Sequence, residues 1–121
     1  MRRISIRKLI WVGSSRKDLD GFPENVKDVM GYALHLAQCG DKHPDSKPLK
    51  GFGGAKTLEV VDNFDRNTFR TVYIVKFAEV VYVLHYFQKK SKSGIATPKP
   101  DMDLIKSRLK EAENIHQALY G

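Results

Sequence analysis

The chain has 121 residues, which is enough for one domain (residues 1–121) with a modest hydrophobic core but not for separate catalytic and regulatory domains. Its 21 Lys and Arg against 14 Asp and Glu give a formal charge of +7, which favours a polyanionic partner. A single cysteine excludes an internal disulfide and is typical of a reducing cytoplasm, and the apolar stretch at residues 9–12 is too short for a signal peptide or a membrane span.

The first third of the chain predicts one strand followed by two helices. Residues 9–13 are β-branched and aromatic and end at a glycine, as in a strand. Ser15 and Asp18 fit a capping box for a short helix, and Pro23 fits the first position of a longer one. In that second helix, apolar residues recur at helical spacing over 26–37.

The middle of the chain changes to a period of two. Residues 41–56 are rich in Lys, Asp, Pro and Gly and predict a loop. Residues 58–64, 69–77 and 80–87 then predict three strands of an antiparallel meander. Because the last two strands are apolar on both faces, we expect them to be central, covered by the helices on one side and partly enclosed on the other.

The end of the chain predicts a helix that follows a basic segment at 88–99. The helical stripe consists of Ile105, Leu109, Ala112, Ile115 and Leu119. The complete prediction is an α+β fold with an N-terminal strand, two helices, a three-stranded antiparallel meander and a C-terminal helix.

Two possible sites in the loop region are not supported by their context. Residues 50–56 contain three glycines, but a phosphate-binding loop needs a strand before it and a helix after it, whereas here a loop precedes and a strand follows. His35, Cys39 and His43 are spaced four apart, but His43 lies beyond the helix stop at Gly40 and a fourth ligand is not obvious. We therefore expect residues 50–56 to form a tight turn, and we expect the protein to use neither a metal nor a cofactor.

The predicted meander brings chemically useful residues together. A two-residue turn at 77–78 would pair Arg70 with His85 across the last two strands. Lys89, Lys90 and Lys92 follow the same end of the last strand. They would form a positively charged concavity, with the aromatic ring of Tyr82, Tyr86 or Phe87 at its base. Charge for phosphates and rings for bases favour an RNA site. The alternative is a solvated, inert pair at the sheet edge.

The sequence also resembles the HigB-like branch of the RelE toxin superfamily, whose members are sometimes described as phage-derived toxin-like proteins. The similarity spans residues 9–112, and the order of the predicted elements is that of the family. The matching stretches are 47–53 (KPLKGFG), 69–73 (FRTVY), 83–92 (VLHYFQKKSK) and 94–99 (GIATPK).

This resemblance implies a type II toxin, a metal-independent endoribonuclease that cleaves mRNA in the decoding site of the 70S ribosome and is inactivated by a helix-turn-helix, HigA-like antitoxin. By position, Arg70 would hold the scissile phosphate and His85 would transfer a proton, while Lys89 and Lys90 would act on the substrate. Candidates for RNA binding are Lys50, Lys56, Phe87, Lys92 and Lys99.

The chain departs from its relatives in the first strand of the meander, which is the second strand of the chain. Relatives often have a basic residue just after the glutamate, whereas here Val60 follows Glu59. This departure shifts the expected activity onto Arg70 and the lysines. It also leaves open a non-catalytic RNA- or antitoxin-binding protein of the same fold. A DNA-binding regulator is disfavoured because no recognition helix of basic and polar residues stands out.

Overall fold

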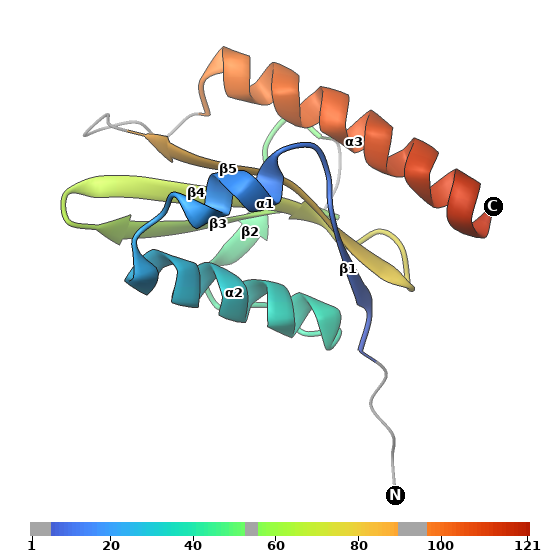
Figure 1. The fold of residues 1–121 in the computed structure, drawn as a ribbon, viewed down its shortest axis with the longest axis horizontal. Coiled ribbons are helices and arrows are strands. Elements are labelled where there is room, and N and C mark those ends of the chain that lie inside the picture. Colours follow the sequence, from blue (N-terminus) through green and yellow to red (C-terminus); the bar gives the residue numbers. More distant parts are fainter. Residues whose placement is uncertain (1–5, 53–55, 90–96) are drawn as a thin grey trace, which may run out of the picture.

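The structure, a computed structural model, describes residues 6–52, 56–89 and 97–121. A five-stranded sheet in the order β1-β5-β4-β3-β2 has α2 on one face and α3 on the other (Figure 1). β1 runs parallel to β5, and the other neighbouring strands are antiparallel. This architecture confirms the predicted α+β class. The elements are β1 (Lys8–Trp11), α1 (Ser15–Asp20), α2 (Glu24–Gln38), β2 (Ser46–Pro48), β3 (Thr57–Phe64), β4 (Asn67–Ile74), β5 (Val80–Lys89) and α3 (Lys99–Tyr120).

Each face of the sheet carries its own hydrophobic core. On the α2 side, Met30 and Leu34 pack against residues such as Tyr73 and Val83. On the α3 side, Ile105 and its neighbours pack against the opposite side chains of β4 and β5. The central position of these two strands is confirmed, and the second face is enclosed in part, by α3. α3 crosses that face (Figure 1).

The register between β4 and β5 differs from the expected one for two reasons, a connection longer than two residues and a β-bulge. Residues 75–79 lie between the two strands, and Ile74 pairs with Tyr82. The longer connection moves the pairing by one residue and a β-bulge moves it by one more, so Arg70 pairs with Phe87 and not with the histidine two positions earlier. The predicted direct pairing of the guanidinium with an imidazole is therefore wrong.

A β-bulge gives His85 its position. The register shifts between Val72 and Tyr73, so that His85 pairs with Val72. A bulge adds one residue to a strand and changes which side chains face each side. The His85 ring therefore lies on the α3 side of the sheet, where it contacts Asp101 and Arg108.

The two N-terminal helices begin differently from their predicted starts. Ser14, not Ser15, is the N-cap of α1, and its hydroxyl donates to Asp18 at 2.9 Å. The predicted capping box is wrong because Ser15 is buried, where its hydroxyl donates to the Val83 carbonyl at 3.2 Å. Pro23 is the N-cap of α2, so the helix begins at Glu24, one residue after the predicted first helical residue.

Two further differences lie at the margins of the fold. Ser46–Pro48, within the predicted loop, forms the edge strand β2, which is too short to show an alternating pattern. An edge strand tolerates Pro48 because one side of it needs no hydrogen-bond donors. In α3, Ile105 and Ala112 are buried as predicted, but Leu119 is 59% exposed.

No helix within the described residues is long and apolar enough to cross a membrane.

Candidate functional site

Three strands place a carboxylate, a guanidinium and an imidazole on the α3 face of the sheet. Val72 pairs with Glu59 on one side and with His85 on the other, so these residues form one row across β3, β4 and β5. The next row on the same face contains Arg70 and its partner Phe87. Arg70 therefore lies one row from both Glu59 and His85.

Arg70 and Glu59 form a buried ion pair. The Arg70 Nη1 atom donates to Glu59 Oε1 at 3.1 Å, and both side chains are only 6% exposed. The same Nη1 atom lies 3.5 Å from the hydroxyl of Thr97. An RNA phosphate that binds this guanidinium must therefore compete with a carboxylate that already compensates its charge.

His85 is held through both of its ring nitrogens. Arg108 can only donate, so its contact at 3.3 Å makes His85 Nδ1 an acceptor. Nε2 then carries the proton of the neutral ring and donates to Asp101 at 2.8 Å. Phe87 stacks on the same ring, with centroids 4.7 Å apart. Because Nδ1 faces Arg108, Nε2 is the atom through which His85 would exchange a proton.

The pKa of His85 is lowered from its ordinary value, chiefly because burial disfavours the charged ring and also because of the nearby Arg108 charge. The hydrogen bond and charge of Asp101, together with the more distant Asp18, oppose this shift without cancelling it. The neutral ring is therefore the form that the fold favours.

We expect the lowered pKa of His85 to make the fold less stable in acid. Below about pH 6.5 the unfolded chain binds a proton at this position more readily than the folded chain, so the free energy of unfolding falls as the pH falls. Urea denaturation at pH 7.5 and at pH 5 measures the effect. His85→Gln should lose part of this pH dependence, whereas the exposed His35→Gln should keep it. Equal pH dependence in wild type and His85→Gln would contradict the assignment.

Arg108 is a site residue that the sequence did not reveal. Its guanidinium donates to the Leu84 carbonyl and to the Ser14 hydroxyl, both at 2.8 Å, and lies 3.9 Å from Asp18. It thereby ties α3 to the bulged part of β5 and to the start of α1. Position 108 falls on the same face as Ile105 and Ala112, and a basic residue on a buried stripe is the signal that could have identified it.

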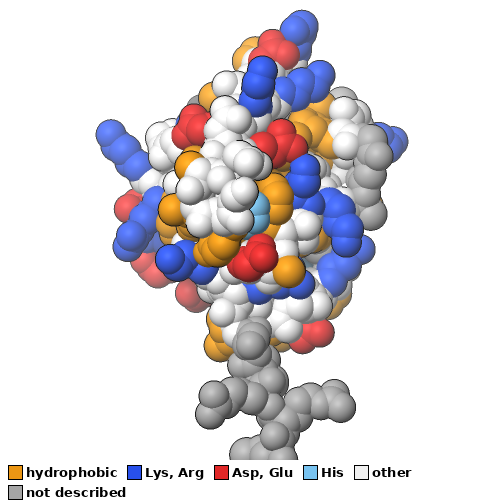
Figure 2. Space-filling model, turned by 90° about the vertical axis from the view of Figure 1, so that its right-hand side faces the viewer, with side chains coloured by type: hydrophobic (Ala, Val, Ile, Leu, Met, Phe, Trp, Pro, Cys, Tyr) orange, Lys and Arg blue, Asp and Glu red, His pale blue; other side chains and the backbone are white. Residues whose placement is uncertain are grey.

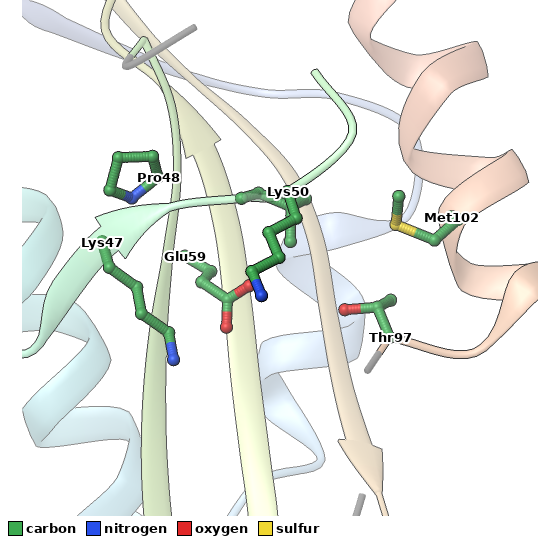
Figure 3. A pocket seen from close by; sticks show the side chains of 7 residues that line it. Lys47, Pro48, Lys50, Glu59, Thr97 and Met102 are labelled. Atoms are coloured by element: carbon green, nitrogen blue, oxygen red, sulfur yellow. The ribbon is translucent and has the colours of Figure 1, made fainter. Parts of the chain in front are cut away.

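A pocket of about 330 Å³ opens beside the Arg70–Glu59 pair. The Lys47 and Lys50 side chains extend toward the Glu59 carboxylate, and Thr97 and Met102 approach from the opposite side (Figure 3). The pocket is lined by Lys47, Pro48, Leu49, Lys50, Glu59, Thr97 and Met102. The predicted RNA-binding residue Lys50 therefore lies beside the Arg70–Glu59 pair. Lys47 is a second positively charged residue of the pocket, which the prediction did not include.

The chain is similar to known proteins over most of its length. A family model described as "Phage derived protein Gp49-like (DUF891)" matches residues 17–110. The chain belongs to this family. The match confirms the resemblance to phage-derived proteins seen in the sequence. A chain of the RelBE2 toxin–antitoxin complex from Mycobacterium tuberculosis is 15% identical, with a TM-score of 0.49, over 75% of this chain and 100% of that chain. No curated protein matches the chain.

The other predicted basic residues of this Gp49-like chain are spread out. Lys56 borders a second hollow, on the α2 side, together with Arg7 and Lys42. Lys99 is exposed in the first turn of α3 and pairs with Asp103 at 2.9 Å. At the end of the molecule where α3 finishes, Lys and Arg side chains are mixed with acidic ones (Figure 2). That face therefore has no continuous basic surface.

The lysine cluster after β5 is only partly described. Lys89 ends β5, where its backbone pairs with Thr68. Its side chain, together with Lys90 and Lys92, lies outside the described residues. The catalytic roles assigned to Lys89 and Lys90 and the RNA-binding role assigned to Lys92 therefore stay predictions.

The aromatic residues expected to floor the site are buried within the Gp49-like fold. Tyr86 lies in the α2-side core. Tyr82 lies under α3, where its hydroxyl bonds to His116 at 2.9 Å. Phe87 is 8% exposed and stacked on His85. The expected open aromatic floor is therefore wrong, because Tyr82 and Phe87 belong to the α3-side core and Tyr86 belongs to the α2-side core.

The His35–Cys39 pair shares a helix face as expected, with 3.7 Å between His35 Nε2 and Cys39 Sγ. Across residues 6–52, 56–89 and 97–121, no group of three or more His, Cys, Asp or Glu side chains is placed to hold a metal ion.

Proposed function

We propose that this protein is the toxin of a type II toxin–antitoxin system and that it is an endoribonuclease that cleaves mRNA on the ribosome. The observation that supports this proposal is the grouping of Arg70 and His85 on one sheet face, beside a pocket whose mouth carries Lys47 and Lys50. Family membership over residues 17–110 agrees with it. A helix-turn-helix antitoxin of the HigA type would keep the enzyme inactive in the cytoplasm.

Metal-independent RNA cleavage needs three contributions. A base removes the proton of the ribose 2′-hydroxyl, a cation stabilises the negative charge of the phosphorane, and an acid protonates the departing 5′-oxygen. Arg70 is permanently charged and suits the second role. His85 Nε2 suits one of the proton transfers. Lys89 and Lys90, whose side chains lie outside the described residues, are our proposal for the other transfer, which rests on the family resemblance.

A second candidate function is a non-catalytic protein of the same fold that binds RNA or its antitoxin. The observation that favours it is the Arg70–Glu59 pair, in which the expected catalytic cation is buried and already compensated. The two candidates share the binding surface and differ in whether the RNA is cut.

Cleavage of mRNA on purified ribosomes, with the 3′ ends mapped, separates the two candidates. We expect cuts in ribosome-bound mRNA and little cutting of the same RNA without ribosomes. RNA that is bound but stays intact would favour the non-catalytic protein. Equal cutting of naked and ribosome-bound RNA would remove the ribosome from the proposal.

Lys47→Ser/Lys50→Ser provides the matched variant for this experiment. The measured quantity is the affinity of the protein for single-stranded RNA at several salt concentrations. Each lost phosphate contact reduces the slope of log affinity against log salt by about 0.7, so the double variant should reduce the slope by roughly 1.4. The control, Lys106→Ser/Lys110→Ser, removes the same charge from exposed positions of α3 and should change the slope little. Equal effects of the two pairs would show that only net charge matters.

A further inference from the structure

The pocket beside Arg70 combines apolar walls with a buried hydrogen-bond acceptor. Pro48, Leu49 and Met102 supply the apolar surface. Glu59 is 4% exposed and presents its carboxylate between the two lysines (Figure 3). A volume of about 330 Å³ is at the lower end of small-molecule sites. This volume can hold a single aromatic base.

The pocket and the guanidinium of Arg70 are neighbours. Arg70 Nη1 lies 3.1 Å from Glu59 and 3.5 Å from Thr97, and both of these residues line the pocket. A phosphate that binds Arg70 would therefore place the base of an adjoining nucleotide at the mouth of the pocket. Lys47 and Lys50 at that mouth match the negative charge of the RNA backbone.

We propose that this pocket binds a guanine base of the mRNA next to the scissile phosphate, with Glu59 as the residue that selects it. This inference rests on the proposed function and gives it a specificity site. An ionised carboxylate only accepts hydrogen bonds, and each of its oxygens accepts more than one. The bond from Arg70 to Oε1 therefore leaves acceptor capacity for a base.

Guanine fits this chemistry better than the other bases. Its Watson–Crick edge offers two adjacent donors, N1–H and the 2-amino group, which match the two oxygens of a carboxylate. Adenine and cytosine each place a ring-nitrogen acceptor beside their amino group, and that acceptor would face the carboxylate. Guanine O6 also offers an acceptor to the ammonium group of Lys47 or Lys50. The Met102 thioether packs favourably against an aromatic ring.

Replacement of guanosine by inosine tests the proposal, because inosine lacks only the 2-amino group. In single-turnover cleavage on ribosomes, we expect an mRNA with inosine next to the cut to react roughly 10-fold or more slowly than the guanosine mRNA. Glu59→Gln should bring this ratio close to 1. The ratio is taken within each variant, so any loss of support for Arg70 cancels. Glu111→Gln, the same change at an exposed position of α3, should keep the wild-type ratio.

Binding of nucleotides supplies a readout that does not depend on cleavage. Guanosine 3′-monophosphate should shift the methyl resonance of Met102 at lower concentration than inosine 3′-monophosphate, and Glu59→Gln should remove the difference. A protein that prefers guanosine in this way but cuts no RNA would uphold the pocket and refute the nuclease. A protein that cuts both mRNAs equally, or whose preference survives in Glu59→Gln, would overturn the inference.

Discussion

Arg70→Ala is expected to lower the free energy of unfolding by about 3–5 kcal/mol and to slow cleavage of ribosome-bound mRNA by about 100-fold or more. The stability loss follows from the buried pair, because Glu59, which is 4% exposed, would lose its counter-charge. The loss of rate follows from the removal of a fixed cation at the phosphate. Arg70→Ala alone therefore cannot separate a loss of stability from a loss of catalytic rate.

A second variant separates the two effects. Glu59→Gln/Arg70→Met removes both charges at similar volume, and such replacements of buried ion pairs are often neutral or stabilising. We expect this double variant to unfold in urea near the wild-type midpoint and still to cleave about 100-fold more slowly than Glu59→Gln alone. Saturating ribosomes and single-turnover conditions remove effects on binding. Cleavage by the double variant at the rate of Glu59→Gln would exclude Arg70 from the chemistry.

Arg70→Lys refines the same prediction. It keeps one positive charge near Glu59 but cannot hold two phosphate oxygens in a fixed plane. We expect it to recover most of the lost stability and only part of the lost rate. Full recovery of the rate would indicate that a point charge suffices.

The sequence was informative where a local pattern decides the structure. The period of two over β3, β4 and β5 predicted three strands, and their two apolar faces predicted that β4 and β5 are central. The register between β4 and β5 was not predictable. It depends on a five-residue connection at 75–79 and on a bulge near His85, and neither can be recognised from the hydrophobic periodicity. Arg70 and His85 were both identified, but as direct partners, which they are not.

The partners of those residues were missed for a related reason. Glu59 comes from β3, whereas Asp101 and Arg108 come from α3, so each contact joins elements whose relative position is set by packing. The lysines at 47 and 50 were visible only as part of a family motif.

The β1–α1 turn supplies the last prediction, because it combines a left-handed backbone angle at Gly13 with a close approach of Arg108. Gly13 has a φ of +59°, and a Cβ at this position would lie 2.7 Å from Arg108 Nε. Gly13→Ala must therefore adopt a left-handed conformation, at a cost of about 1–2 kcal/mol, and also displace the guanidinium. Loss of the hydrogen bonds of Arg108 to Leu84 and Ser14 adds about 1–3 kcal/mol.

A double-mutant cycle distinguishes these two costs. In an Arg108→Ala background, Gly13→Ala should cost only the backbone strain, so the two changes should be less than additive by about 1–3 kcal/mol. Urea denaturation of the four proteins measures the coupling. Gly40 is the matched control, since its φ is +85° but a Cβ there meets nothing within 4 Å. Gly40→Ala should be additive with Arg108→Ala. If Gly13→Ala were equally additive, the turn would be strained by its backbone alone and would not position the guanidinium that holds His85.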